Sequence, residues 1–214
     1  MNHSSTSRQR VLDRIRAAAP GSAARERDYA ALERPYTRTG SLTAEARVAL
    51  MTERLREYDA GVTECASGEL PAAVAAALAA SGRKTFVAPA GLPSAWLAPG
   101  FEWKIDRDLS AGQIEGVDGV VTACFCGIAD SGTIVLHHSA AEGRRLVSLL
   151  PDWHLCILRA SQIVETLPEY FARCPQPPGL VTWISGPSAT ADIEMTRIKG
   201  VHGPRFLQVI VVRD

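Results

Sequence analysis

The fold is decided by the stretch Leu180-Val-Thr-Trp-Ile184, Ser185-Gly-Pro-Ser-Ala-Thr-Ala-Asp-Ile-Glu194, Gly200-Val-His-Gly-Pro204 and Phe206-Leu-Gln-Val-Ile-Val-Val212. Its first and last parts are short apolar runs rich in β-branched residues, which is the pattern of buried strands. Between them lie two Gly-Pro pairs, hydroxyl groups, two carboxylates and a histidine. Polar side chains between two core strands lie in loops at strand ends, where a rigid scaffold positions functional groups. We therefore expect a candidate site in this stretch.

The polar part of this stretch has the composition of an anion-binding loop. Gly186 permits close approach of the backbone, and Ser188 or Thr190 could cap a helical turn whose N–H groups bind a carboxylate or phosphate. In the structural alternative, Ser188 only caps, and Asp192 and Glu194 only offset the helix dipole. Local chemistry alone favours the structural alternative slightly, because the strict capping-box spacing is absent.

The composition is that of an ordinary globular chain. It has 214 residues, of which 46% are hydrophobic and 21% charged, and its formal net charge is zero. Bulk electrostatics therefore indicates neither nucleic acid nor an anionic membrane as a partner. No apolar run is long enough to span a bilayer, and no signal-peptide pattern is present. The five cysteines are odd in number and scattered, which indicates reduced thiols and a cytoplasmic protein.

Strand and helix patterns alternate along most of the chain. Residues 1–40 predict an N-terminal helix, over 8–19, and a linker arm that packs on the body or on a neighbouring subunit. The later helices are expected over 41–58, 69–80 and 161–174, and the strands over 62–65, 84–88, 101–105, 117–125, 133–137, 154–158, 180–184 and 206–212. This order predicts one α/β domain over 41–214, with a largely parallel sheet flanked by helices.

Two sets of apolar residues are expected to face the interior. The strands should supply the core residues Val120, Val121, Ile134, Val135, Leu155, Ile157, Val181, Ile184, Val209 and Val211. The helix over 161–174 should bury Ile163, Val164, Leu167 and Phe171 on its inner face.

Two further loops carry polar groups. Asp130 and Ser131 lie in a Gly-flanked turn, which is either ordinary loop chemistry or part of a cleft. His154 begins an apolar run, so a hydrogen-bonded core histidine is a simpler interpretation than a catalytic one. Asp152 either orients His154 or stabilises the turn before it. His202 lies between two glycines that indicate a tight turn, and no spacing in the chain predicts a metal, P-loop or dinucleotide site.

We predict that the loops 127–133, 151–154, 186–194 and 200–204 converge outside the carboxyl ends of parallel strands, where ligands bind such sheets. The predicted catalytic or acid–base residues are Asp192, Glu194 and His202. The predicted ligand-binding residues are Asp130, Ser131, Thr133, Gly186, Ser188 and Thr190.

Four motifs together resemble the LUD domain family of lactate-utilization proteins. They are Gly127-Ile-Ala-Asp-Ser-Gly-Thr-Ile-Val-Leu136, Leu150-Pro-Asp-Trp-His154, Ile184-Ser-Gly-Pro-Ser-Ala-Thr-Ala-Asp-Ile-Glu194 and Gly200-Val-His-Gly-Pro204. Their order and spacing make the resemblance specific, and it is strongest over residues 117–214. The chain departs from the family at Asp130-Ser131, where members usually have Glu-Thr, and at Ala189, where members usually have Arg or Lys. The second change removes a cation from that loop.

The resemblance implies a fold similar to the 5-formyltetrahydrofolate cyclo-ligase and CoA-transferase superfamily. It also implies an accessory subunit in the oxidation of L-lactate to pyruvate, with iron–sulfur clusters on a partner protein and no cofactor in this chain. A small carboxylate or related anion is the ligand that such a role suggests. The alternative is a stand-alone ligase or transferase acting on a CoA ester, a folate or a nucleotide-activated carboxylic acid, which a bound nucleotide or CoA would indicate.

Overall fold

The computed structural model describes residues 6–19, 28–190, 198–199 and 202–213. The chain divides into two compact units, Met1–Tyr36 and Thr37–Asp214. In the first unit, the hydroxyl of Thr6 caps helix α1 (Ser7–Ala18), which leaves Val11 and Ile15 exposed. Among the helices in the described ranges, none combines the length and apolarity that crossing a bilayer requires.

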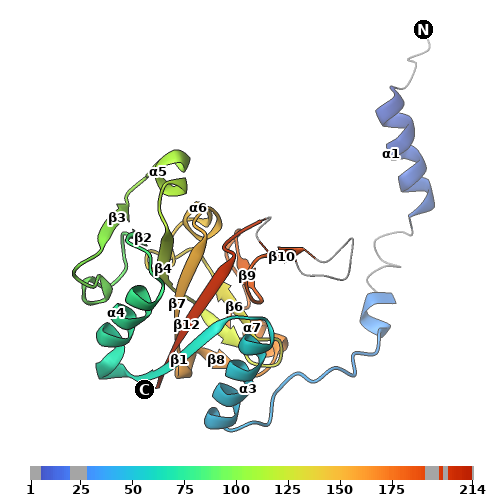
Figure 1. Ribbon diagram of the computed structural model, residues 1–214. Helices are drawn as coiled ribbons and strands as arrows, with labels where there is room; N and C mark the ends of the chain where they lie inside the picture. The colour runs from blue at the N-terminus through green and yellow to red at the C-terminus, as the bar shows by residue number, and fades with distance from the viewer. Residues whose placement is uncertain (1–5, 20–27, 191–197, 200–201, 214) are drawn as a thin grey trace. The chain divides into compact units, whose positions relative to one another are not determined.

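The second unit is built on a six-stranded parallel sheet, the main sheet (Figure 1). From edge to edge its strands are β1 (Gly61–Ala66), β12 (Phe206–Arg213), β7 (Trp153–Arg159), β4 (Gly119–Ala123), β2 (Thr85–Pro89) and β3 (Glu102–Asp106). All neighbouring pairs are parallel. The central strands are almost continuously apolar, because both faces of a parallel sheet are covered. The predicted parallel α/β arrangement is therefore confirmed.

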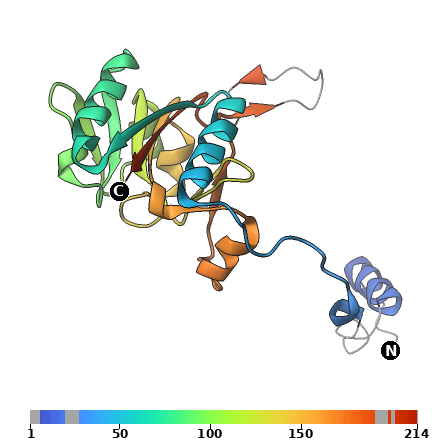
Figure 2. The same cartoon turned by 90° about the horizontal axis from the view of Figure 1, so that it is seen from below.

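Different layers cover the two faces of the main sheet (Figures 1 and 2). On one face, helix α4 (Leu70–Ala80) and the 3₁₀ turn η2 (Ser94–Trp96) pack on alternate strand residues such as Leu155 and Ile210. On the other face, helix α3 (Ala44–Glu57) packs on Leu158 and Val209. Two short helices, α5 (Ala111–Glu115) and α6 (Arg145–Leu149), cover the rest of that second face.

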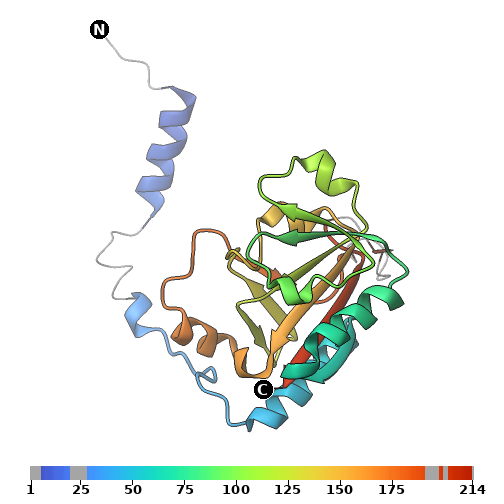
Figure 3. The ribbon, with the colours of Figure 1, turned by 90° about the vertical axis from the view of Figure 1, so that its left-hand side faces the viewer.

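A smaller four-stranded sheet adds to the face that α3 covers (Figure 3). Its strands, in order, are β8 (Ile163–Val164), β5 (Cys126–Ile128), β6 (Thr133–Leu136) and β9 (Thr182–Ile184). The sequence prediction missed this sheet: residues 117–125 were expected to form one strand, but the chain leaves the main sheet at Cys124 and enters the smaller sheet as β5. A two-residue ribbon, β10 (Ala189–Thr190) with β11 (Ile198–Lys199), follows β9.

The expected helix over 161–174 is wrong in its first half. Residues 160–162 form the 3₁₀ turn η3 (Ala160–Gln162), β8 pairs with β5, and only α7 (Leu167–Arg173) is helical. Ile163 and Val164 are buried as expected, whereas Leu167 and Phe171 are 47% and 46% exposed. Pairing with β5 overrides the helical pattern, because β-branched residues fit a buried strand. The buried residue of α7 is instead Tyr170.

The predicted strand core is largely confirmed. The buried members are Val120, Val121, Ile134, Val135, Leu155, Ile157, Val209 and Val211. Val181 and Ile184 are only half-buried. They lie at β9, an edge strand of the smaller sheet, so one side of each has no neighbouring strand to cover it.

Candidate functional site

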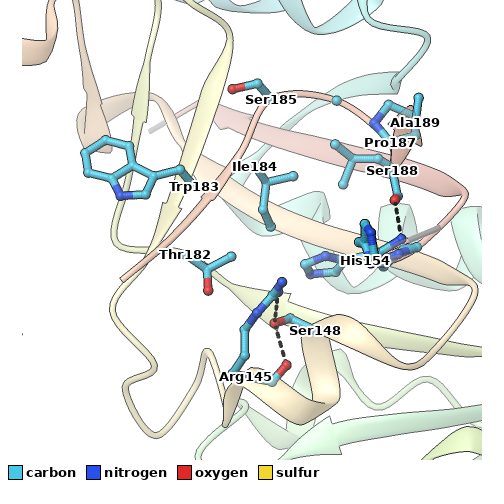
Figure 4. Close-up of a pocket in the computed structure, with 15 residues that line it drawn as sticks. Arg145, Ser148, His154, Thr182, Trp183, Ile184, Ser185, Pro187, Ser188 and Ala189 are labelled. Atoms are coloured by element: carbon cyan, nitrogen blue, oxygen red, sulfur yellow. Dashed lines mark hydrogen bonds between the residues drawn. The ribbon is translucent and has the colours of Figure 1, made fainter. Parts of the chain in front are cut away.

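A pocket of about 230 Å³ lies between the main sheet, β9 and α6 (Figure 4). Its polar lining consists of Arg145, Ser148, His154, Thr182, Ser185, Ser188 and His202. His154 and Leu207 are the second residues of β7 and β12, and the residues around Pro204 precede β12. The pocket therefore lies at the amino ends of these two strands.

The predicted position at the carboxyl ends is wrong. The loops of the site lead into β7 and β12 instead of following parallel strands. At the carboxyl ends of β2 and β4, the loop over residues 137–143 covers the sheet edge: Gly91 N–H donates to the Ala140 carbonyl at 2.9 Å, and Ala123 N–H donates to the Ala141 carbonyl at 3.1 Å. Backbone packing thus occupies the edge where the ligand was expected.

The two halves of the deciding stretch are held together by hydrogen bonds. Ser188 N–H donates to the Pro204 carbonyl at 2.8 Å, and His202 N–H donates to Ser188 Oγ at 3.1 Å. Gly186 has a φ of 85°, and a Cβ there would meet the Tyr58 side chain at 2.5 Å, so both the turn and the close approach require glycine. Because Ser188 Oγ accepts from His202, its own proton is available to a ligand.

His154 is a buried wall of the pocket, with an exposed fraction of 1%. Its Nε2 lies 2.8 Å from Thr122 Oγ1 on the neighbouring strand β4. Burial, the larger cause, and the nearby charge of Arg145 together lower the pKa of His154 from 6.5 to about 4. The imidazole is therefore neutral near pH 7. The expectation of a hydrogen-bonded core histidine is confirmed, and the ring also faces the pocket.

Arg145, at the start of α6, is the permanent cation of the pocket. Figure 4 shows its side chain extending between Ser148 and the His154 ring, and its Nη1 lies 3.4 Å from Ser148 Oγ. Within the described ranges it has no carboxylate partner. The preceding Arg144 differs, since it pairs with Asp106 through contacts of 2.7 and 2.9 Å. Sequence reasoning missed Arg145, although two consecutive arginines that enter the apolar run 146–150 are a signal for it.

A histidine clamp fixes the wall of the pocket opposite the main sheet. His138 Nδ1 lies 2.8 Å from the Gly143 carbonyl, and its Nε2 lies 2.8 Å from Thr182 Oγ1. Because a carbonyl only accepts, Nδ1 carries the proton in the neutral ring, and Thr182 donates to Nε2. The clamp joins β9 to the loop that leads into α6, so it sets the distance between Thr182 and the cation.

The structure brings some of the predicted site residues together. Gly186, Ser188 and His202 line the pocket. Thr133 is one hydrogen bond away, since its Oγ1 lies 2.8 Å from Ser185 Oγ, which belongs to the lining. Ser131 follows at 2.8 Å from Thr133 Oγ1.

Other predicted residues are placed differently. Asp130 is exposed in the turn between β5 and β6 and does not line the pocket. Thr190 is described by its backbone alone, in β10, and Asp192 and Glu194 lie outside the described residues. Asp152 does not orient His154: it accepts from Arg205 Nε at 2.5 Å and lies 3.5 Å from Arg83. It therefore stabilises the turn, which is the second of the two predicted roles.

The side chains that commonly bind metal ions are dispersed in the described part of the chain. Within the described ranges, no three His, Cys, Asp or Glu side chains gather closely enough to hold a metal ion. Burial raises the pKa of Cys126 to about 12, and contact with Cys156 together with burial raises the pKa of Cys124. These two side chains are therefore thiols near neutral pH.

Comparison with known proteins gives consistent matches. Residues 48–212 match the LUD domain. A lactate utilization protein C from Deinococcus radiodurans is 41% identical over 182 residues, which cover 83% of this chain and 85% of that protein. The uncharacterized protein YkgG of Escherichia coli is 41% identical over 103 residues, or 45% of this chain and 44% of that protein. The crystal structure of a duf162 family protein from Deinococcus radiodurans aligns with a TM-score of 0.68 at 37% identity, covering 80% of this chain and 99% of that chain.

Proposed function

Because this chain belongs to the LUD domain family, we propose that it serves in lactate utilization, as an accessory subunit of a system that oxidises L-lactate to pyruvate. One observation carries the proposal: the pocket presents Arg145, which has no carboxylate partner among the residues that the structure describes. Small carboxylic acids are both the substrate and the product of lactate oxidation. The cation therefore matches the chemistry that the similarity to lactate utilization protein C suggests.

The pocket is suited to a small carboxylate. A guanidinium group binds the two oxygens of a carboxylate with two parallel hydrogen bonds. The hydroxyl of Ser188 has a proton to donate, and the polar ring of His154 forms part of the wall. A volume of about 230 Å³ is below the roughly 300–1,000 Å³ of pockets for drug-sized ligands. The size therefore favours a molecule of a few heavy atoms.

The proposed subunit has no redox centre of its own, and iron–sulfur clusters are expected on partner proteins. The alternative, a stand-alone ligase or transferase related to 5-formyltetrahydrofolate cyclo-ligases and CoA transferases, needs room for a folate, a nucleotide or CoA. The small pocket at the amino ends of β7 and β12 does not favour that alternative.

Growth on L-lactate tests the proposal. Deleting the gene should abolish growth on L-lactate as sole carbon source and leave growth on pyruvate unchanged, because only the oxidation step is lost. The wild-type gene should restore growth, whereas Arg145→Gln should not, since it removes the charge and keeps most of the side-chain volume. Arg56→Gln is the matched control, because Arg56 is an exposed arginine of α3 outside the pocket lining. Normal growth of the deletion strain on L-lactate would overturn the proposed function.

A further inference from the structure

The charge inside the pocket is low for an anion site. Among the described lining residues, Arg145 is the one permanent cation, and none is a carboxylate. The remaining polar groups are hydroxyls and the two imidazoles of His154 and His202. An anion with a single charge is balanced by this set, whereas an anion with two charges keeps one of them uncompensated in a partly desolvated pocket.

The environment of His154 keeps the charge low. The ring lies on the main sheet with an exposed fraction of 1%, and the charged group of Arg145 reaches it from α6. The other groups that its surroundings supply are the hydroxyl of Thr122 from β4 and, across the pocket, His202. No carboxylate of the described lining is present to stabilise an imidazolium. A pKa of about 4 agrees with this geometry.

We infer that this pocket is selective for monocarboxylates over dianions. In this inference Thr122 donates to His154 Nε2, Nδ1 carries the proton, and His154 determines the selectivity by giving a hydrogen bond to the ligand without adding a second positive charge. The inference rests on the proposed function only in taking a small carboxylate as the ligand. Two independent features carry it: the single guanidinium, and the buried ring of His154, which lines the pocket and whose Nε2 is engaged by Thr122.

A substitution at Ala189 can test the inference by a gain of binding. Its side chain lines the same pocket from the opposite loop and is exposed enough to be extended. A lysine at this position adds a second cation to the lining without removing a group that contacts the ligand. If the number of cations sets the selectivity, the Ala189→Lys variant should accept dianions.

The test measures the affinity of the full-length protein for L-lactate and for malonate, a dianion of similar size, by calorimetric titration at about pH 7.5. The wild type should bind L-lactate more tightly than malonate by about tenfold or more, a ratio that corresponds to one uncompensated charge in a semi-polar site. Ala189→Lys should lower this ratio by about tenfold, and the matched neutral control Ala189→Gln should leave it unchanged. Titration in two buffers of different ionisation enthalpy should show almost no proton uptake on binding of L-lactate.

Each other outcome overturns the inference. Equal affinity of the wild type for both anions means that the number of cations does not set the selectivity. Uptake of about one proton per L-lactate means that a histidine becomes the second cation. Binding of neither anion refutes the ligand as well. A strain that grows on L-lactate without the gene, combined with the predicted selectivity, would refute the proposed function alone.

Discussion

Consecutive residues at the start of β7 face opposite sides of the main sheet. The charged groups are paired on one side, and on the other side a cation has no carboxylate partner within the described ranges. On the α4 side, Trp153 packs on Phe86 with ring centroids 5.8 Å apart, and the guanidinium of Arg83 lies 4.9 Å from the centre of the Phe206 ring. The charge of Asp152 is neutralised there by Arg205 and Arg83. On the α6 side, His154 borders a pocket whose cation has no carboxylate partner within the described ranges.

The difference separates structural charges from candidate functional ones. Asp152 lies one residue before Trp153 and only two before His154, so the sequence allows an Asp–His pair. Alternation along a strand would place residues 152 and 154 on the same face. Asp152 lies before the first residue of β7, however, and the turn there directs it to Arg205 instead. A charge that a neighbour already satisfies contributes to the fold, whereas Arg145 keeps its hydrogen-bonding capacity for a ligand. Four substitutions test this contrast, in order of decreasing effect on stability.

Replacing Trp153 by alanine should have the largest effect. The ring is 6% exposed and belongs to the core under α4, so its loss should lower the free energy of unfolding by about 3–5 kcal/mol. Urea denaturation measures this loss. Trp183→Ala is the control, because that ring is 42% exposed and its loss should cost about 1 kcal/mol or less. Equal losses for the two variants would contradict the assignment of Trp153 to the buried core on the α4 side of the main sheet.

Acid should lower the stability of the protein through His154, on the α6 side of the main sheet. Because its pKa falls from 6.5 unfolded to about 4 folded, the unfolded chain binds the extra proton between these values. Stability should therefore be complete above about pH 6.5 and decrease by about 3 kcal/mol as the pH falls to about 4. His154→Gln should flatten the dependence of the unfolding free energy on pH in this window. A pH dependence that persists in this variant would place the titrating group outside the sheet.

Removing the charge of Asp152 should have a small effect. The hydrogen bond from Arg205, the largest cause, lowers the pKa of Asp152 below its ordinary value of 3.8. The side chain is 34% exposed, so solvent screens the pair, and Asp152→Asn should cost about 1 kcal/mol or less. This stabilisation is present above the unfolded pKa and is lost as the pH falls through the folded pKa. The cost of the substitution measured by urea unfolding should hence be the same at about pH 5 and pH 8, and a cost that grows between these two values would implicate another group.

Arg145→Gln should change stability least. The arginine has no ion pair in the described part of the chain to lose, so the free energy of unfolding should stay within about 0.5 kcal/mol of the wild type. Binding of L-lactate, followed by calorimetry, should nevertheless disappear. Arg144→Gln is the informative counterpart: it breaks the contact with the buried carboxylate of Asp106, so it should destabilise the protein more than Arg145→Gln does. The opposite ranking would invert the roles assigned to these two arginines.

The sequence predicted those elements whose pattern is local. Long apolar runs such as 206–212 identified the main strands, and the alternation with helices predicted the parallel sheet. Gly186, Ser188 and His202 are predicted site residues because they lie between two such runs, and all three line the pocket. These signals depend on a few neighbouring residues, which is why a single sequence is enough to read them.

Elements that depend on distant partners could not be predicted in this way. β8 has two residues and exists because β5 lies beside it, while the helical spacing of the same segment suggested a longer helix. The consecutive arginines before residues 146–150 mark Arg145 as a candidate, but its place in the pocket depends on the packing of α6 beside β2 and β4, which are distant in sequence. The edge of the sheet that holds the pocket was predicted incorrectly, because the rule for carboxyl ends does not include the loop over 137–143 that covers them.

The pairing of β1 with β12 has a consequence for how the protein is made. β1 begins at Gly61 and pairs with Gln208 and the residues after it, so its neighbour is the latest of the six strands along the chain. During synthesis, β1, β7 and their helices emerge before the strand that must fill the gap between them. Such long-range parallel pairing is slow to form and leaves strand edges open to self-association meanwhile. A nascent chain that stalls before β12 should therefore be a substrate for chaperones.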